Sequence, residues 1–180
     1  MTRIAVISDT HFPSHGRTLP ATCLAAIEGA DLLIHAGDLA DAATLTMLRR
    51  LGPPLLAVFG NADDADVRDD LPASVEHEID GLRLAIVHNG GPEAGRLKRL
   101  AKRFPEADVV IFGHSHIPLL AREPSGLTIL NPGSATDRRR QPLHSMAEIH
   151  ASSGQSPEVT FRGLDGPGGP LPEELIRSVG

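Results

Sequence analysis

Apolar residues recur along the first third of the chain in two alternating patterns. Continuous apolar runs rich in β-branched residues predict buried strands at Arg3–Ile7, Leu32–His35 and Leu55–Phe59. Between them, helical spacing of apolar residues predicts helices at Thr18–Gly29 and Asp41–Leu51, with Asp41 as the N-cap of the second. This order is typical of a βαβαβ unit, in which the strands are parallel and the functional loops follow their carboxyl ends.

The middle and the end of the chain predict a second group of strands. Val75–Ile79 alternates like a half-exposed strand, and Asp80-Gly81 joins it in a hairpin to Leu82–Val87. A helix at about Glu93–Phe104 and a buried strand at Asp108–Phe112 follow. The remaining runs are typical of an antiparallel meander: Leu119–Arg122, Leu127–Leu130, His144–His150 and Glu158–Arg162. The expected fold class is therefore α/β, with two sheets.

Two segments lack a clear period. The acidic stretch Asp63–Asp70 is expected to be a loop or a frayed helical turn. Residues 166–180 are rich in Gly and Pro, too rich in turn formers to extend a strand, and resemble a tether or a partner-docking arm. We therefore expect a single domain over residues 1–165, followed by a C-terminal tail.

The composition is that of an ordinary soluble globular protein. Of the 180 residues, 41% are apolar and 22% are charged, which is enough to build a core. No apolar run approaches the roughly 20 residues of a membrane-spanning helix, so no membrane partner is expected. The N-terminal apolar run reaches Asp9 too soon for a signal peptide, which makes the cytoplasm the expected location. The single cysteine, Cys23, lies in an apolar setting that indicates helix packing.

Charge and aromatic content narrow the set of partners. The net charge of -6, from 23 acidic and 17 basic residues, argues against duplex nucleic acid, because such binding neutralises many phosphates with Lys and Arg. Trp and Tyr are absent, which removes most of the platforms on which single-stranded bases stack. A small anion can still be bound locally, and a homo-oligomer is left open. The nine histidines are many for this length, and histidine is the commonest metal ligand.

Each predicted buried strand ends at a residue that can bind a metal. These residues are Asp9 and His11, then Asp38, then Asn61, then His88, and finally His114 and His116. Carboxylates, an amide oxygen and imidazoles together are the donors that suit a pair of divalent transition metals. Because the carboxyl ends of neighbouring parallel strands meet at one edge of a sheet, the donors are expected to converge.

Residue spacing indicates how these donors are presented. Asp9-Thr10-His11 and His114-Ser115-His116 each place two donors two residues apart, so in extended backbone each pair projects from one face. Asp38 and Asn61 each follow a glycine, which permits a sharp turn and close backbone approach to a buried cation. Turn chemistry explains a single Gly-Asp or Gly-Asn, but it does not explain the ordered set of donors at five strand ends.

Six motifs stand in order along the chain: Ser8-Asp9-Thr10-His11, Ala36-Gly37-Asp38, Gly60-Asn61-Ala62-Asp63, Val87-His88, Gly113-His114-Ser115-His116 and Asn131-Pro132-Gly133-Ser134. Together they resemble the calcineurin-like metallophosphoesterases, in particular their small phosphodiesterase subgroup. The resemblance covers nearly the whole chain. It implies a metallo-dependent phosphatase fold, a four-layer αββα sandwich in which two facing mixed sheets are flanked by helices.

The resemblance also implies a dinuclear metal site. The implied assignment is Asp9, His11 and His116 on one ion, Asn61, His88 and His114 on the other, and Asp38 as the bridge. Bridging suits a carboxylate, whose two oxygens can serve two ions. Mn²⁺ is the expected metal, with Zn²⁺, Fe²⁺ and Ni²⁺ as alternatives. The implied activity is hydrolysis of small phosphodiesters or nucleotide-like substrates by attack of a metal-bridging hydroxide.

One position departs from the family. Where most members carry a histidine after Gly-Asn, thought to protonate the leaving group or steady the transition state, this chain has Ala62. A methyl group cannot donate a proton, so no residue is assigned as catalytic, and activated phosphodiesters are the favoured substrates. His15 could reach the pocket as a substitute, although its position favours a solvated loop residue.

Three further residues are candidates for supporting roles. Asn131 either forms a tight turn or orients a ligating histidine. Asp63 could orient a metal-bound water, although its acidic neighbours favour exposed surface. Arg138, in a run of three arginines, could bind substrate phosphate, although its position favours a solvated loop. His35, inside an apolar strand, is expected to be a buried histidine bonded to backbone and not a ligand.

Two other functions compete with the phosphodiesterase. A phosphomonoesterase or protein phosphatase would use the same metals. A non-catalytic scaffold is the third reading, because the same fold serves as a protein-binding subunit in the retromer coat, where the metal site is incomplete. In this chain every ligand position is filled, and idle donors clustered in one cavity would be costly without a cation, which weighs against the scaffold.

Overall fold

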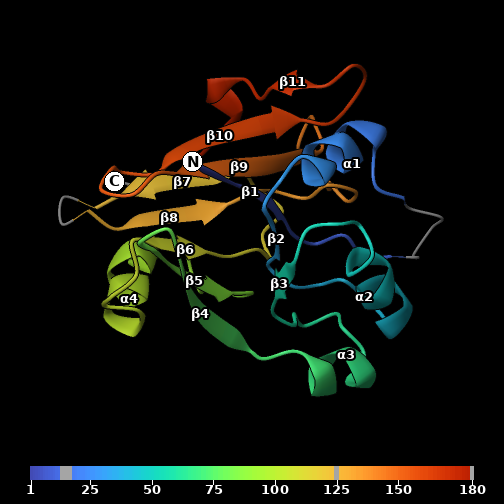
Figure 1. The fold of residues 1–180 in the computed structure, drawn as a ribbon, viewed down its shortest axis with the longest axis horizontal. Helices are drawn as coiled ribbons and strands as arrows, with labels where there is room; N and C mark the ends of the chain where they lie inside the picture. Colours follow the sequence, from blue (N-terminus) through green and yellow to red (C-terminus); the bar gives the residue numbers. More distant parts are fainter. Residues whose placement is uncertain (13–17, 124–125, 179–180) are drawn as a thin grey trace.

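Two mixed β-sheets and four α-helices make up the structure (Figure 1), a computed structural model that describes residues 1–12, 18–123 and 126–178. The first sheet contains, in spatial order, β11 (Gly169–Pro170), β10 (Glu158–Gly163), β9 (Ser145–Ala151), β1 (Thr2–Ile7), β2 (Leu32–His35) and β3 (Leu55–Ala57). The second contains β4 (Ser74–Ile79), β5 (Leu82–Val87), β6 (Val109–Ile111), β8 (Thr128–Asn131) and β7 (Leu119–Arg122). The helices are α1 (Ala21–Glu28), α2 (Ala42–Leu48), α3 (Ala65–Asp70) and α4 (Arg96–Arg103).

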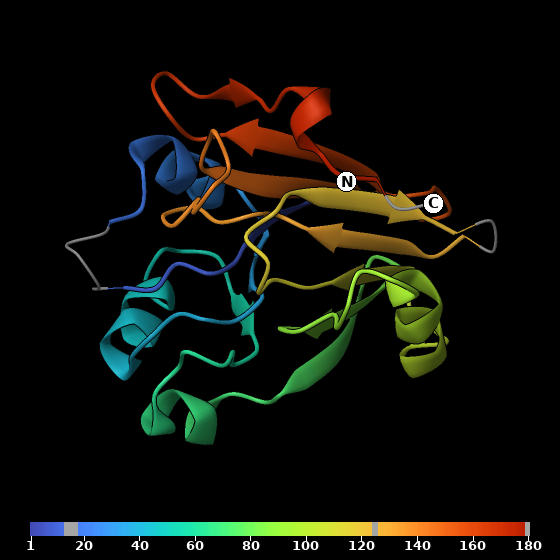
Figure 2. The ribbon, with the colours of Figure 1, turned by 180° about the vertical axis from the view of Figure 1, so that it is seen from behind.

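Alternation of side chains along the strands creates three apolar clusters that hold the layers together. In β1, Ile4 and Val6 point into a cluster that residues of both sheets share. The intervening Ala5 and Ile7 belong to a second cluster with residues of α1 and α2. Leu100 of α4 belongs to a third cluster, on the outer face of the second sheet. The layers therefore follow the order helix, sheet, sheet, helix (Figure 2), and the predicted fold class is confirmed.

The helices are shorter than their sequence patterns predict. α1 begins after Pro20, and not at Thr18. Asp41 caps α2 as predicted, since its side chain accepts a hydrogen bond from the Thr44 N–H at 2.8 Å. The acidic stretch forms a helix, α3. Asp64 caps it by accepting a hydrogen bond from the Val67 N–H, and the Val67 side chain buries the inner face of the helix. Within the described ranges, no helix combines the length and the apolar character needed to cross a bilayer.

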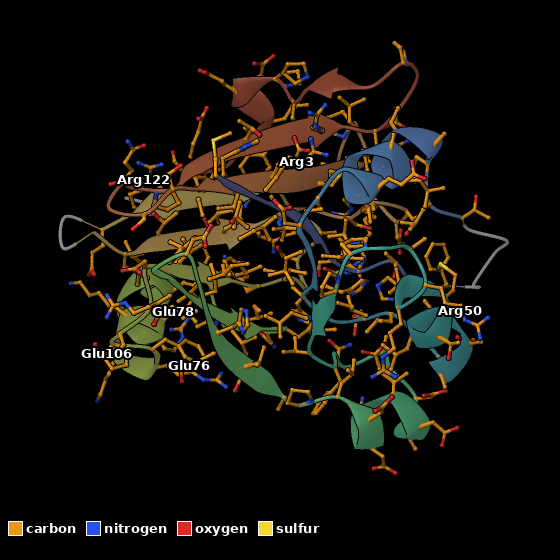
Figure 3. All side chains as sticks on the ribbon, in the orientation of Figure 1. Arg3, Arg50, Glu76, Glu78, Glu106 and Arg122 are labelled. Carbon is orange, nitrogen blue, oxygen red and sulfur yellow. The ribbon has the colours of Figure 1, made fainter. Side chains whose placement is uncertain are left out.

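The edge of the second sheet carries the predicted hairpin. Glu76 and Glu78 of β4 are exposed at the periphery of the molecule (Figure 3), as expected for a half-exposed strand. Asp80 and Gly81 join β4 to β5 with φ angles of 50° and 78°. Two successive residues with positive φ are what a tight two-residue hairpin turn requires. Charged side chains on this edge strand also discourage pairing with another chain.

The predicted meander of the last four strands was wrong. β7 and β8 form a hairpin in the second sheet, where β8 is parallel to β6. β9 and β10 form another hairpin, and β9 pairs with β1 in the first sheet. Turn signals identify each hairpin locally, but the choice of sheet depends on which edge lies open in the assembled fold.

The expectation that the C-terminal tail cannot form a strand was also wrong. Gly169–Pro170 form β11, an edge strand, where a proline without an N–H is tolerated. Leu171 is buried in the cluster between the sheets, and its N–H donates to Phe161 O at 2.9 Å. Arg177 exchanges backbone hydrogen bonds with the segment around β7. The segment therefore connects an edge of the first sheet to the second.

Candidate metal centre

The candidate site lies where the carboxyl ends of the parallel strands of both sheets meet. β1, β2 and β3 are parallel to one another, and so are β5 and β6. Hydrogen bonds join the loops that follow them: the Asp9 N–H donates to Gly37 O at 3.0 Å, and the Gly113 N–H donates to His88 O at 2.9 Å. Between the sheets, the His114 N–H donates to the Asp9 carboxylate. The structure thus brings the seven strand-end donors together.

The backbone of these loops is not extended, contrary to the expectation from residue spacing. Five of the donors have positive φ: Asp9 at 55°, His11 at 49°, Asp38 at 60°, His114 at 68° and His116 at 58°. The left-handed region is unfavourable for residues other than glycine, and such strain concentrates at functional sites. As a result, His114 and His116 diverge into different clusters, whereas Asp9 and His11 share one.

The first cluster consists of Asp9, His11 and His116, whose ligand atoms lie within 4.8 Å of one another. The Nε2 atom of His116 lies 3.3 Å from Asp9 Oδ1 and 3.3 Å from His11 Nε2. The other ring nitrogen, Nδ1, hydrogen bonds to the carbonyl of Asp137, so Nδ1 carries the proton. This leaves the Nε2 lone pair facing the cluster, as in metal-ligating histidines.

The second cluster consists of Asp38, His88 and His114, and Asn61 lies beside it. His88 Nδ1 donates to Ala36 O at 2.8 Å, which directs its Nε2 toward the cluster. Asn61 Oδ1 lies 3.2 Å from His88 Nε2 and 2.7 Å from His114 Nδ1. The amide oxygen and the two imidazoles therefore surround one point, as expected for a shared cation.

Asp38 stands between the two clusters. Its Oδ2 atom lies 3.3 Å from His88 Nε2 and 3.7 Å from His11 Nε2. The other oxygen, Oδ1, accepts a hydrogen bond from the Ala62 N–H at 2.7 Å. A single oxygen therefore faces both clusters, and not the two oxygens that the sequence suggested. The side chain is almost fully buried, so its position is tightly constrained.

Burial and charge shift the pKa values of these groups. Burial opposes protonation of His88, but Asp38 and Asp9 outweigh it and raise its pKa. Burial raises the pKa of Asp9 to about 7, so its ionised form needs a neighbouring cation. Burial also lowers the pKa of His116 to about 4 and lowers the pKa of His114. Neutral imidazoles are the form that binds a metal. Burial opposes ionisation of Asp38, but His88 and the Ala62 N–H outweigh it and lower its pKa to about 2.

Two of the proposed supporting residues position the loops that carry the donors. Asn131 is buried, and its Nδ2 donates to Gly113 O at 2.7 Å and to Ser115 Oγ at 3.1 Å, which holds the loop between β6 and β7. Asp63 is buried, not exposed as its acidic neighbours suggested. It accepts backbone hydrogen bonds at 2.6 to 3.1 Å from the N–H groups of Asp38, Ala40 and Gly60. Its contacts fix the loop of Asp38.

The remaining candidates lie outside the cluster or outside the described chain. Arg138 is exposed and donates to the carbonyl of Gln141. His35 is fully buried, lies 3.0 Å from Thr10 Oγ1 and accepts from the Gly37 N–H at 3.2 Å, which agrees with a structural histidine. His15 lies outside the described residues.

Sequence reasoning missed two residues that fasten the site from the loop after β8. Thr136 donates from Oγ1 to Thr10 O at 2.6 Å, and Asp137 supplies the carbonyl that orients His116. Ser134 of the Asn131-Pro132-Gly133-Ser134 motif donates a further hydrogen bond from Oγ to Asp9 O at 2.8 Å. The sequence does contain a signal for these contacts: Ser134 and Thr136 follow Asn131, and hydroxyl side chains in loops often form hydrogen bonds to nearby backbone groups.

The glycines next to the donors are needed because side chains approach them. A Cβ at Gly37, where φ is 92°, would lie 2.6 Å from His88 Nδ1. A Cβ at Gly60 would lie 2.1 Å from Asp38 Oδ1, and one at Gly113 would lie 2.0 Å from Ser8 Oγ. The sequence suggested close approach to a cation, but in the structure the close neighbours are two candidate donor side chains and Ser8, which is bonded to Asp9.

Comparisons with known proteins agree with this geometry. Residues 2–154 match the family described as the calcineurin-like phosphoesterase superfamily domain. A probable metallophosphoesterase of Methanothermobacter thermautotrophicus is 37% identical over 74% of this chain and 77% of the relative. A probable metallophosphoesterase of Methanocaldococcus jannaschii is 35% identical over 81% of this chain and 74% of the relative. The structure of Vacuolar Protein Sorting 29 from Cryptosporidium parvum superposes with a TM-score of 0.79 at 19% identity, covering 93% of this chain and 94% of that one.

Proposed function

Since the chain belongs to the calcineurin-like phosphoesterase superfamily, we propose that it is a dinuclear metal-dependent phosphodiesterase. The family and the names of the curated relatives support a hydrolytic phosphoesterase. The proposal adds the number of metals, the diester substrate class and a cytoplasmic site of action. The proposed substrates are small or nucleotide-like phosphodiesters, because the net charge of -6 argues against binding of duplex nucleic acid.

One observation carries the proposal: the Oδ2 atom of Asp38 faces both donor clusters. A carboxylate oxygen placed between two sets of imidazoles is suited to hold two cations close together. Asp9, His11 and His116 would hold one ion. Asn61, His88 and His114 would hold the other. Mn²⁺ is our first choice of metal, with Zn²⁺, Fe²⁺ and Ni²⁺ as alternatives.

When bound, such a pair of ions supplies an activated water and neutralises charge on the phosphoryl oxygens. The chain's own residues position the ions and shape the reaction. Asp38 is held by the Ala62 N–H and, through its backbone, by Asp63. Asn131 holds the loop that carries His114 and His116. Rigid placement of this kind aligns a nucleophile with the leaving group.

Position 62 limits the substrates in this proposal. The Ala62 side chain carries no proton, and its N–H is committed to Asp38 at 2.7 Å. A leaving group that needs protonation would gain no general acid from this residue, a contribution worth about 10²- to 10⁴-fold. Aryl and other activated phosphodiesters, which leave as stable anions, are therefore the favoured substrates.

Two alternatives use the same geometry. A phosphomonoesterase or protein phosphatase would bind the same ions. A non-catalytic scaffold would use the fold alone, and the likeness to Vacuolar Protein Sorting 29, at 19% identity, concerns the fold. The complete donor set favours an enzyme over a scaffold, because buried donors without a cation are costly.

Elemental analysis followed by a substrate screen tests the proposal. The purified protein is loaded separately with Mn²⁺, Ni²⁺, Zn²⁺ and Mg²⁺, and the turnover of mono- and diesters with the same 4-nitrophenyl leaving group is compared. We expect about two metals per chain and preference for the diester. Fewer than about one metal per chain under every condition would favour the scaffold, and faster monoester turnover would favour the phosphatase.

A substitution of Asp38 and a matched control test whether Asp38 bridges the two metal ions. Asp38→Asn should lower metal content and reduce turnover by about 10²-fold or more, because the bridge loses its charge. Asp69→Asn changes an exposed acid of α3 and should behave as the parent protein. Full metal content together with parental turnover in Asp38→Asn would refute the bridging role.

A further inference from the structure

The donors of the second cluster are not all held in the same way. Asp38 and His88 are buried, whereas Asn61 and His114 are exposed. Asn61 Oδ1 nevertheless lies 3.2 Å from His88 Nε2 and 2.7 Å from His114 Nδ1. Because packing does not enclose Asn61, the position of its amide oxygen depends on the hydrogen bonds that hold its loop.

Arg68, in α3, makes three contacts with the segment that contains Asn61. Its Nη2 donates to Asn61 O at 2.7 Å, and its Nε donates to Asp63 O at 2.9 Å. Its Cζ lies 5.6 Å from the centroid of the Phe59 ring, as in a cation–π pair. The guanidinium is planar and its N–H groups have a fixed geometry, so these contacts together hold the segment in one orientation.

The elements that bring the guanidinium to this loop are themselves anchored. α3 is held by Val67, which is fully buried, and by the Asp64 N–H, which donates to Ala40 O at 3.0 Å. Phe59 packs against the apolar cluster beneath α1 and α2, and its N–H donates to Pro72 O at 3.1 Å. The guanidinium therefore acts on the loop from a fixed position.

We propose that Arg68 is a positioning residue for a divalent cation in the second cluster: by holding the main chain of Asn61, it keeps the amide oxygen in place to bind the ion. This inference rests on the proposed function, because it takes the second cluster as a metal site. A metal site requires its ligands within a few tenths of an ångström of their places. Loss of a residue that orients a ligand weakens metal binding by about 10- to 100-fold.

Calorimetric titration with Mn²⁺, after removal of metal with a chelator, measures the two binding steps. Asn61→Ala identifies the step that belongs to the second cluster. We expect Arg68→Gln to weaken this step about tenfold or more and to change the other step by less than about threefold. Arg68→Lys keeps the charge but cannot donate to both carbonyls in the same geometry, so its affinity should lie between those of Arg68→Gln and the parent.

Arg49 provides the matched control. Its Nη1 donates to Asp70 Oδ2 at 2.8 Å, so it also contacts α3. Within the described ranges, its guanidinium forms no hydrogen bond with residues 59–63. Arg49→Gln should therefore bind Mn²⁺ within about twofold of the parent in both steps.

A double variant separates positioning of Asn61 from a general structural role. If Arg68 acts through Asn61, adding Arg68→Gln to Asn61→Ala should weaken the second-cluster step by less than about twofold. A further loss of about tenfold in this background would overturn the inference. Parental affinity in Arg68→Gln, or equal weakening of both steps, would also overturn it. Tighter binding would do the same, because repulsion between the guanidinium and the cation would then be its main effect.

The same titrations separate this inference from the proposed function. A parent protein that binds two Mn²⁺ ions but hydrolyses no diester refutes the proposed function, while the affinities of the variants still decide the role of Arg68. A parent protein that binds no metal under any condition overturns both.

Discussion

Replacing Gly60 with alanine should disturb the candidate metal centre by displacing one residue, Asp38. A Cβ at this position would lie 2.1 Å from Asp38 Oδ1 and 2.8 Å from its Cγ. The backbone cannot yield easily, since the same Cβ would lie 2.5 Å from the Asp38 nitrogen, which donates to Asp63. Asp63 also holds the Gly60 N–H at 2.6 Å. The carboxylate of Asp38 must therefore move.

The cost can be worked out from the contacts that this movement breaks. Asp38 Oδ1 would lose the hydrogen bond from the Ala62 N–H, which as a charge-assisted bond is worth about 1.5 to 3 kcal/mol. Overpacking adds about 1 to 3 kcal/mol. The lower entropy of the unfolded alanine chain offsets about 0.4 to 1 kcal/mol. We expect a net loss of roughly 2 to 5 kcal/mol in the free energy of unfolding.

A matched variant controls for the added methyl group. Gly163 in β10 also lacks a positive φ, but a Cβ there would meet Leu143 Cδ1 at an ordinary 3.4 Å. Gly163→Ala should therefore change stability by less than about 1 kcal/mol. Urea denaturation in the presence of a chelator measures the metal-free stability of both variants. Calorimetric titration with Mn²⁺ should show about 10- to 100-fold weaker binding in Gly60→Ala alone. Equal behaviour of the two variants in both assays would refute the argument.

Three further predictions address the leaving group, the tail and the dependence of stability on pH. Ala62→His should speed hydrolysis of diesters with alkoxide leaving groups by about tenfold or more relative to aryl diesters, and an unchanged ratio of the two rates would count against the role assigned to this position. Leu171→Ala should lower the free energy of unfolding by about 2 to 4 kcal/mol, because the side chain is buried between the sheets. As a control, Leu24→Ala at an exposed position should lower it by under about 0.5 kcal/mol. Equal losses in the two variants would mean that the tail does not pack against the sheets. A hydrogen bond from Arg83 lowers the pKa of Asp108 in the folded state, so this pair stabilises the fold above the ordinary carboxyl range near about 4 and loses its effect as pH falls through the lowered pKa. Urea unfolding of Arg83→Gln should show a deficit near about pH 7 that shrinks near about pH 3, and a deficit independent of pH would contradict the linkage.

Much of the fold could be predicted because its signals are local. Alternation and apolar runs placed the strands of the βαβαβ unit, and the Asp41 cap of α2 is as predicted. The donors at the strand ends could be identified because parallel strands end at the same edge of a sheet. The Asp80-Gly81 turn needs only its own two residues to adopt positive φ.

The errors concern choices that no local pattern contains. Whether β8 pairs with β6 or with β9 depends on which edges are open when the strands assemble. The tail packs because Leu171 finds a place between the two sheets. Asp63 lies in an acidic run, and its burial follows from three backbone N–H groups that the loops of β2 and β3 bring to it.

By itself, the sequence determined the strands, the two-sheet architecture and the inventory of donors, because backbone periodicity and residue chemistry are properties of short segments. Residue spacing alone did not separate His114 from His116; the resemblance to the family implied their division, and the left-handed backbone of the folded loop produces it. The tertiary structure alone decided that one oxygen of Asp38 faces both clusters. These outcomes depend on left-handed backbone angles and on bonds between loops far apart in the chain, which exist only once the two sheets have packed.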